Sequence, residues 1–397
     1  MSAPVLKLGI AGIGRAFSFM IPTFRDDPRV AIVAGFDPRA EARARFAQDF
    51  GARAYESMEE LCASEVDAIY IASPHQFHAP QVAMAAAHGK HVLVEKPMAL
   101  SLQDCQAMIE ATRKAGVHLI VGHSHSFDAP IRKIAELVEA GTYGRLRMIT
   151  ALNFTDFLFR PRRPEELDST QGGGAIYNQA PHQVEMLRLI AGGRVKSVRA
   201  MTGVWDASRP TEGAYNAFLT FENGISATMT YSGYAHFDSD ELLDWTNEIG
   251  LKKDPKHYGA ARKAILASGN LAEESALKNA RNYGGSAYTD LSGESARQHQ
   301  TFGFLTASCE RADLRAFGDG VRVYGDLEQI FLSLEPPQIP RSEVVDELFA
   351  AVFDNVAPLH SGEWSLATME VCLALLQSAR EGREIFMKHQ IGTGVRA

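Results

Sequence analysis

The chain has 397 residues, of which 46% are hydrophobic and 22% charged, and its formal net charge is -8 at pH 7. The length is enough for two domains with separate cores, and the composition is that of a globular protein. The mildly acidic balance disfavours nucleic acid as a partner. No run of about 18 apolar residues occurs and the amino terminus does not resemble a signal peptide, so we expect a cytoplasmic protein without a membrane span.

The four cysteines predict neither a metal centre nor a disulfide framework. Cys62, Cys105, Cys309 and Cys372 lie far apart, without a CxxC pair or a histidine at metal-ligand spacing. We therefore expect reduced thiols and no bound metal.

Residues 1–127 are predicted to form one α/β domain with a doubly wound parallel sheet. Short apolar runs alternate with amphipathic helical stretches, several of which begin after Ser, Asp or Pro and end at Gly. Such alternation gives a parallel sheet covered by helices on both faces. The apolar runs lie at residues 6–12, 30–37, 66–73, 90–96 and 117–123.

Residues 128–397 are predicted to form an α+β domain with a large, mostly antiparallel sheet. Longer alternating strands begin at about residue 145, and Asn223-Gly224 is typical of a hairpin turn. One helix is expected near residues 182–193, and a last helical pattern runs from Ser342 to about Ala379. An open face of this sheet would expose too much apolar surface for a monomer, so we expect a homodimer or homotetramer.

Residues 237–300 resemble an insertion in the second domain. The segment is charged and rich in Lys, Asn, Ala and Gly, with some helical tendency. We interpret it as a solvated surface excursion or an oligomer contact in preference to a substrate lid.

A glycine turn directly follows the first predicted strand. Gly12 and Gly14 stand where a Rossmann fingerprint needs a sharp turn and close approach of the pyrophosphate. Phe17 replaces the third glycine, so the following helix must sit further from the strand or Phe17 must point outward. The turn predicts a dinucleotide site at the amino end of a helix.

Asp37 ends the second predicted strand, 23 residues after Gly14. An acidic residue there is placed to bind the adenosine ribose hydroxyls and repels the extra phosphate of NADP. Arg39 stands two positions later and can offer a counter-charge. We favour NAD over NADP as the cofactor.

A lysine and a proline follow another strand at the same sheet edge. Glu95-Lys96-Pro97 comes directly after an apolar run, which places Lys96 where open α/β sheets bind their ligands. Pro97 stops the strand, and Pro74 ends the neighbouring strand in the same way.

These motifs resemble those of the glucose-fructose oxidoreductase, inositol dehydrogenase and MocA (Gfo/Idh/MocA) family over nearly the whole chain. The resemblance rests on the glycine turn, on Ser73-Pro74 with His78, on Glu95-Lys96-Pro97 and on the segment from Gly173-Gly174 to His182. It implies a Rossmann domain whose cofactor contacts are Gly12, Ile13, Gly14, Arg15, Ala16, Phe17, Asp37, Arg39, Ser73, Pro74, His75, His78, Glu95 and Lys96.

The resemblance also implies that Lys96 and His182 are the catalytic pair. Hydride transfer from a carbinol carbon requires loss of the hydroxyl proton, which a histidine of near-neutral pKa accepts while an ammonium stabilises the oxyanion. Most of the family has an aspartate where this chain has Asn178. Asn178 takes no proton but can orient His182 or bind a substrate hydroxyl, so the base role shifts toward His182.

Two further stretches are candidates for substrate binding. His123 and His125 follow the last predicted strand of the first domain, and Arg160, Arg162 and Arg163 precede the segment that leads to His182. Arginine binds carboxylates through paired hydrogen bonds, so three arginines favour a dicarboxylate over a neutral sugar. A solvated surface loop is the competing interpretation.

Five further stretches are informative within the family: the GxGRAF turn at 12–17, GHSHSFD at 122–128, HFDSDE at 236–241, SCER at 308–311 and LHSGEW at 359–364. Through them the chain resembles the branch of phthalate 4,5-cis-dihydrodiol dehydrogenases. That resemblance implies a reaction of phthalate degradation. The substrate is 4,5-dihydro-4,5-dihydroxyphthalate, a dihydrodiol dicarboxylate formed from an aromatic ring, and its oxidation gives 4,5-dihydroxyphthalate. One alternative is a sugar, inositol or polyol dehydrogenase of the same family. Another is an NAD-binding sensor without catalytic activity.

Overall fold

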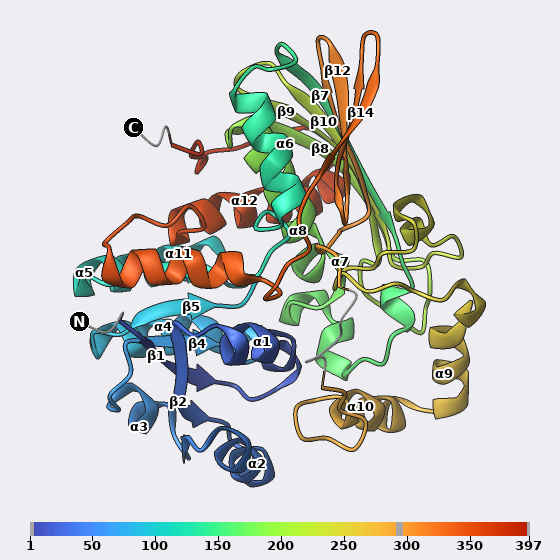
Figure 1. Ribbon diagram of the computed structural model, residues 1–397. Coiled ribbons are helices and arrows are strands. Elements are labelled where there is room, and N and C mark those ends of the chain that lie inside the picture. Colours follow the sequence, from blue (N-terminus) through green and yellow to red (C-terminus); the bar gives the residue numbers. More distant parts are fainter. Residues whose placement is uncertain (1–3, 291–296, 395–397) are drawn as a thin grey trace. The chain divides into compact units, whose positions relative to one another are not determined.

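The computed structural model describes residues 4–290 and 297–394, which form two compact units (Figure 1). The first unit contains the described residues up to His123, together with two later segments that begin at Ala276 and Gln338. The second contains most of the remainder, from Ser124 onward. The expected division after residue 127 thus omits two segments that return to the first unit, because side chains far apart in the sequence complete its core.

The first unit is built on a six-stranded parallel sheet of order β3-β2-β1-β4-β5-β6, as the sequence predicts. Between β1 and β4 the strand order reverses, which is where open α/β sheets bind ligands. Leu8 and Ile10 of β1 and Ile69 of β4 are fully buried, as expected for strands covered on both faces. The strands are β1 (Leu6–Ala11), β2 (Val30–Phe36), β3 (Arg53–Tyr55), β4 (Ala68–Ile71), β5 (His91–Val94) and β6 (Leu119–Val121).

The helices between these strands follow the predicted stop and start signals. Ser57 and Ser101 cap α3 and α5, and Gly51 and Gly116 end α2 and α5 in the left-handed conformation. The helices are α1 (Arg15–Asp26), α2 (Ala40–Phe50), α3 (Met58–Cys62), α4 (His78–Ala87) and α5 (Leu102–Ala115).

The second unit contains a nine-stranded, mostly antiparallel sheet of order β14-β13-β12-β11-β7-β10-β9-β8-β15. Among the described strands of this second sheet, only β7 and β10 pair in parallel. The Asn223-Gly224 hairpin is confirmed, with Gly224 at φ +85°. The strands are β7 (Leu146–Phe154), β8 (Val195–Gly203), β9 (Ala214–Phe221), β10 (Ser226–Ser232), β11 (Phe304–Cys309), β12 (Ala312–Phe317), β13 (Gly320–Gly325), β14 (Gln329–Ser333) and β15 (Ile385–Phe386).

Three helices of this unit position the candidate site. The predicted helix near residues 182–193 is α8 (Ala180–Ala191), which is almost wholly buried and packs against β7 and β10. It is preceded by α6 (Ala129–Glu139) and by the short α7 (Gly174–Asn178).

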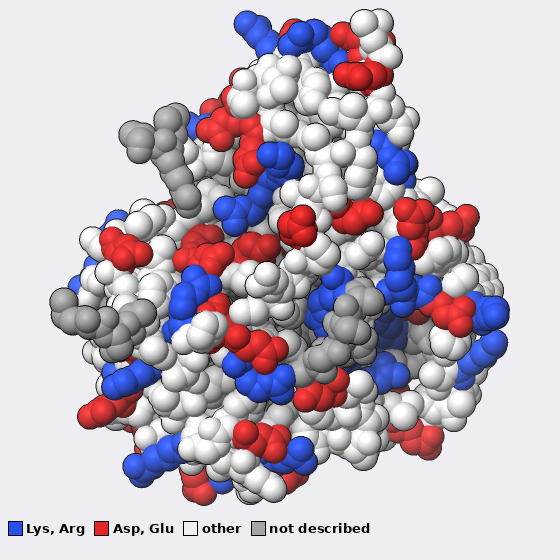
Figure 2. Space-filling view, in the orientation of Figure 1, with Lys and Arg blue, Asp and Glu red and all other residues white. Residues whose placement is uncertain are grey.

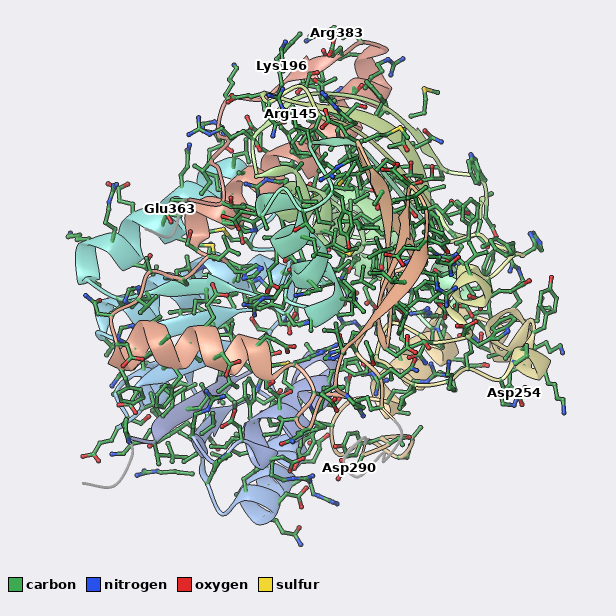
Figure 3. All side chains as sticks on the ribbon, turned by 45° about the horizontal axis from the view of Figure 1, so that its top comes forward. Arg145, Lys196, Asp254, Asp290, Glu363 and Arg383 are labelled. Carbon is green, nitrogen blue, oxygen red and sulfur yellow. The ribbon has the colours of Figure 1, made fainter. Side chains whose placement is uncertain are left out.

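Charged side chains such as Lys196, Asp254 and Arg383 project outward (Figure 3), and acidic and basic side chains are interspersed on the face in Figure 2.

The last helical pattern is two helices instead of one. α11 (Ser342–Phe353) and α12 (Gly362–Glu381) are separated by residues 354–361. Asn355 lies at φ +54° and Pro358 follows it, so the chain cannot continue as one helix. Among the described residues, no helix is long and apolar enough to cross a membrane.

Part of the expected insertion packs against the first unit. Residues 237–275 stay with the second unit and include α9 (Ala260–Ser268), whereas the segment after α10 (Leu271–Ala280) belongs to the first. Residues 291–296 of the expected insertion lie outside the described residues.

Tyr283 anchors this returning segment. Its ring centroid lies 5.6 Å from that of Phe17 and 6.2 Å from that of Phe50, and its hydroxyl donates to Asp49 Oδ2 at 2.6 Å. Only 3% of Tyr283 is exposed. Within residues 276–290 only Tyr283 is buried, so an apolar cluster of the first unit anchors this segment through one ring, while the residues around it are exposed or half-buried, as expected for a surface excursion.

Replacement of Tyr283 should separate the packing contribution of its ring from that of its hydroxyl. Tyr283→Ala should lower the free energy of unfolding by about 3–5 kcal/mol, because the ring leaves a cavity. Tyr283→Phe should cost about 1 kcal/mol through the lost hydrogen bond. Urea unfolding of both variants measures the difference, and equal losses would contradict the aromatic cluster as the anchor.

Candidate active site

The glycine turn has the geometry of a dinucleotide cradle. Gly12 lies at φ +92°, and a Cβ there would come within 2.7 Å of Ser73 N, so only glycine fits. A Cβ on Gly14 would meet nothing within 4 Å, which leaves open space beside the first amides of α1. A helix amino terminus next to open space is suited to a pyrophosphate. These residues therefore fit the predicted cofactor.

Asp37 lies beside the turn, as predicted, but its carboxylate is already engaged. Its Oδ2 accepts from Ile13 N at 2.8 Å, and its Oδ1 accepts from Arg39 N and Nε at 2.9 Å each. Arg39 Nη2 also donates to Ile13 O at 2.7 Å. Asp37 and Arg39 thus brace the turn as an ion pair, and ribose binding by Asp37 stays a prediction.

Phe17 does not point outward, which excludes one of the two expected arrangements. Its side chain is fully buried between Phe46, Phe50 and Tyr283, with ring centroids 5.6–5.9 Å away. The predicted contact of Phe17 with the cofactor is therefore limited to its backbone, because the ring has no surface left for a ligand.

His78 ties the two loops at the sheet edge together. Its ring is fully buried, with Nε2 3.0 Å from Ser73 O and Nδ1 3.0 Å from Pro97 O. Burial lowers the pKa of this histidine. The ring thus links the loop after β4 to the loop after β5, and a contact of His78 with the cofactor stays a prediction.

Glu95 and Lys96 occupy the predicted place after β5. Tyr70 OH donates to Glu95 Oε1 at 2.5 Å, and burial raises the pKa of the Glu95 carboxyl. Lys96 is half-buried. Lys96 belongs to the first unit and His182 to the second, so their approach to each other remains a prediction.

The segment that carries His182 is shaped by two glycines and an amide. A Cβ on Gly173 would come within 2.6 Å of Glu166 O, and one on Gly174 within 2.4 Å of Thr211 Oγ1. Asn178 Nδ2 donates to Gly172 O at 3.1 Å and to Gly174 O at 2.8 Å. Asn178 therefore holds the loop by donating, which a carboxylate oxygen cannot do.

His182 lies in the first turn of α8 with two other rings around it. It is 7% exposed, and its ring centroid lies 4.7 Å from those of His125 and Phe302. The structure thus brings the predicted residues His125 and His182 together. His123 is buried as the last residue of the first unit's amino-terminal segment.

The three loop arginines all pair with carboxylates of the protein. Arg160 Nε contacts Asp156 Oδ1 at 2.9 Å, and its Nη1 contacts Glu248 Oε1 at 2.7 Å. Arg163 Nε lies 3.1 Å from Glu165 Oε1. The loop is therefore not a set of solvated charges, and substrate binding by these arginines stays a prediction.

Arg162 is the most buried of the three. It stacks on the Phe157 ring at 3.8 Å and donates through Nη2 to Phe157 O at 2.6 Å. Its backbone N donates to Glu274 Oε1, which also receives Arg209 Nη1 at 2.7 Å. Burial lowers the pKa of Arg162. Glu274, which anchors this loop from α10, was not identified from the sequence because only the fold brings it near.

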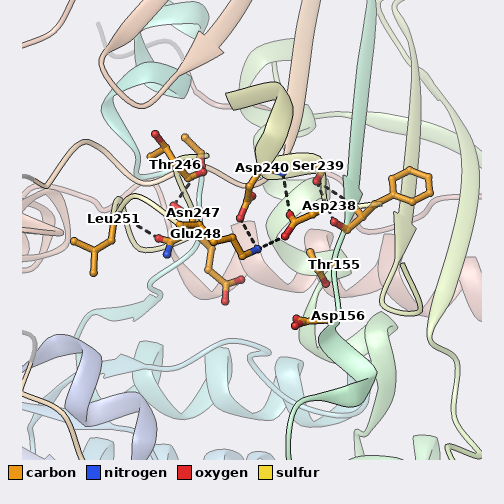
Figure 4. Close-up of polar contacts among 12 residues, drawn as sticks. Thr155, Asp156, Asp238, Ser239, Asp240, Thr246, Asn247, Glu248 and Leu251 are labelled. Carbon is orange, nitrogen blue, oxygen red and sulfur yellow. Dashed lines mark hydrogen bonds and ion pairs between the residues drawn. The ribbon is translucent and has the colours of Figure 1, made fainter. Parts of the chain in front are cut away.

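An acidic cluster beside this loop was likewise missed. Lys253 Nζ bridges Asp238 Oδ2 and Asp240 Oδ2, the latter at 3.0 Å, and Glu248 lies on the same segment (Figure 4). The only sequence signal was the density of acids in residues 237–248. Among the described residues, no group of three or more His, Cys, Asp or Glu side chains is arranged to hold a metal ion.

Asp240 should make stability depend on pH in the acidic range. Burial raises the pKa of its carboxyl from 3.8 to about 6, although Lys253 opposes the shift. The folded state therefore favours the protonated form, and this contribution to stability is complete below about pH 4 and lost as pH rises through about 6. The free energy of unfolding of the native chain, relative to Asp240→Asn, should fall across that window in urea titrations.

Lys253→Gln provides the contrasting variant. Loss of the ammonium removes the charge that favours the Asp240 carboxylate, so the fall in stability with pH should become steeper. Parallel pH curves for the native chain and Asp240→Asn would contradict a raised pKa.

Comparison with protein families matches both units. Residues 6–123 match the model described as "Oxidoreductase family, NAD-binding Rossmann fold". Residues 131–249 match the model described as "GFO/IDH/MocA C-terminal domain". Together these matches cover more than half of the chain.

Similar proteins agree with this assignment. The chain is 45% identical over 377 residues to 1-carboxy-3-chloro-3,4-dihydroxycyclohexa-1,5-diene dehydrogenase of Comamonas testosteroni, covering 94% of this chain and 95% of that protein. The solved structure of a putative dehydrogenase from Bordetella bronchiseptica RB50 is 42% identical with a TM-score of 0.91, covering 96% of this chain and 100% of that one.

A more distant relative is myo-inositol 2-dehydrogenase of Thermotoga maritima, 30% identical over 198 residues, which are 49% of this chain and 58% of that protein.

The matches to both domain models and the long alignment with the Comamonas protein leave one assignment. The chain belongs to the Gfo/Idh/MocA family of oxidoreductases, and its first unit is the NAD-binding Rossmann domain of that family.

Proposed function

We propose that the protein is an NAD-dependent dehydrogenase that oxidises the cis-dihydrodiol of a carboxylated aromatic ring to a catechol. The specific substrate expected from the sequence is 4,5-dihydro-4,5-dihydroxyphthalate, an intermediate of phthalate degradation. The observation that carries the proposal is the 45% identity, over 94% of the chain, to a dehydrogenase named for a carboxylated dihydroxycyclohexadiene.

Two predicted catalytic side chains supply the groups that this oxidation needs. When bound, the dinucleotide accepts a hydride from the carbinol carbon. His182, buried at the start of α8, takes the hydroxyl proton, and the ammonium of Lys96 stabilises the developing oxyanion. The open space at Gly14 and the start of α1 hold the pyrophosphate.

NAD is the preferred cofactor in this proposal. The carboxylate of Asp37, 4% exposed at the end of β2, disfavours a second phosphate nearby. Its ion pair with Arg39 reduces that repulsion, so the expected preference is moderate instead of absolute.

The ion pairs of the arginine loop favour a second candidate substrate with one carboxylate. Arg160 is already opposed by Asp156 and Glu248, so little positive charge remains to attract a dicarboxylate. A cis-dihydrodiol with one carboxylate needs less positive charge from this loop than a dicarboxylate does. The name of the Comamonas relative also contains a single carboxy group.

The exposed side of the nine-stranded sheet supports self-association. Met148, Met201 and Phe218 on β7, β8 and β9 are 46%, 61% and 46% exposed. Apolar side chains on an open sheet face favour pairing with a second copy. We therefore keep a homodimer or homotetramer as part of the proposal.

A substrate panel tests the proposed function. NADH or NADPH formation is measured at 340 nm with the 4,5-dihydrodiol of phthalate, the cis-dihydrodiols of benzoate and benzene, myo-inositol and glucose, each with NAD and NADP. The carboxylated diols should exceed the benzene diol in kcat/KM by about 10–100-fold, the effect of a charged hydrogen bond of about 1.5–3 kcal/mol. Turnover of only myo-inositol or glucose would support the polyol alternative, and NADH binding without any turnover would support the sensor.

Single variants test the catalytic pair. Lys96→Ala and His182→Ala should each lower kcat/KM by at least about 10²-fold, because each removes a charge or proton acceptor from the transition state. Lys114→Ala on α5 and His88→Ala after α4 are exposed controls that should keep full activity. Near-native turnover of either catalytic variant would overturn the assigned roles.

A further inference from the structure

A second histidine lies against the proposed base. The ring of His125 meets His182 edge to face, with centroids 4.7 Å apart and planes at 65°. Phe302 packs on both, 4.8 Å from His125 and 4.7 Å from His182. His125 is only 4% exposed. The two imidazoles therefore form one buried cluster with a shared apolar wall.

A buried carboxylate orients His125. Its Nδ1 lies 2.6 Å from Asp128 Oδ2, and both side chains are 5% exposed. A carboxylate at this distance accepts the Nδ1 proton, so the lone pair of the neutral ring is on Nε2. The same arrangement fixes the tautomer and the orientation of the imidazole in catalytic sites.

The Asp128 side chain contacts His125 and does not cap the helix that follows it. It stands immediately before α6, where an aspartate side chain normally accepts from the amides of the first turn. The Asp128 side chain does not cap α6, and the Asp128 carbonyl accepts from Ile131 N and Arg132 N. The carboxylate is thus directed at His125.

The neighbouring buried carboxylate is engaged elsewhere. Glu185 Oε2 accepts from Ser126 Oγ at 2.9 Å and also from Ser124 Oγ. Glu185 lies one turn after His182 on α8. Of these two buried carboxylates, Asp128 binds the imidazole of His125, whereas Glu185 binds the serine hydroxyls.

We infer that His125 is a second proton acceptor, which catalyses aromatisation after the diol is oxidised, and that Asp128 is its positioning residue. The inference rests on the proposed function. Oxidation of one diol carbon removes a hydride and the hydroxyl proton and leaves a ketone. The adjacent diol carbon still carries a hydrogen, which must be removed before the ring becomes a catechol.

His125 takes this second proton. The C–H electron pair becomes the new C=C bond, and the ketone oxygen receives a proton from His182 to become a hydroxyl. The proton on His125 leaves to solvent. In total the diol loses one hydride to NAD and one proton to water, which balances the conversion to a catechol. Two adjacent imidazoles match the two proton transfers of the reaction.

Single-turnover measurements separate the two steps. With NAD in excess, hydride transfer is followed at 340 nm and the catechol by rapid quench and chromatography. Both should form together in the native enzyme. In His125→Gln, the catechol should lag behind NADH by about 10²-fold, the usual effect of a lost general base, and the hydroxydienone should accumulate. Asp128→Asn should produce a smaller lag, because the imidazole remains.

Glu185→Gln is the matched control, since it neutralises the other buried carboxylate and should keep the two signals together. Thermal midpoints verify folding, and Asp128→Asn decides the question if His125→Gln does not fold. Catechol formation in step with NADH in both His125→Gln and Asp128→Asn would overturn the inference, as would equal loss of both signals. Absence of NADH formation by the native enzyme with every dihydrodiol would instead overturn the proposed function.

Discussion

The close approach of the backbone at Gly12 to residues 72 and 73 is the constraint on which the first unit's site depends. β1 lies between β2 and β4. A Cβ at position 12 would lie 2.7 Å from Ser73 N, so only glycine allows the chain to turn sharply after β1. α1 therefore starts beside open space at Gly14. Ser73 O in turn contacts His78, whose ring reaches Pro97 O beside Lys96. One continuous set of contacts thus relates the glycine turn to the lysine.

In the second unit, the placement of carboxylates governs the chemistry that is available. Buried charges are stable only when they are paired or hydrogen bonded. Glu274 pairs with Arg209, and Asp156 and Glu248 pair with Arg160. Asp128 pairs with an imidazole that contacts His182. A loop that looks strongly basic in sequence is therefore nearly neutral in the fold, whereas a stretch of histidines and serines contains the carboxylate–imidazole pair of Asp128 and His125.

The missing third glycine has a structural counterpart far along the chain. Phe17 enters an aromatic cluster with Phe46 and Phe50, and Tyr283 closes that cluster from the returning segment. The large side chain at position 17 is thus accommodated because its ring is buried in this cluster. The same contact explains why part of the expected insertion belongs to the first unit.

The sequence by itself determined the alternation of strands and helices in the first unit, the mostly antiparallel sheet of the second, the hairpin at Asn223-Gly224 and the family. These follow from local periodicity, turn residues and short motifs, which act between near neighbours along the chain. Only the tertiary structure decided which charges meet. The partners of Arg160, Arg162 and Phe17 lie 88, 112 and 266 residues away at Glu248, Glu274 and Tyr283. Pairing over such separations depends on how the elements pack, so no local pattern reveals it.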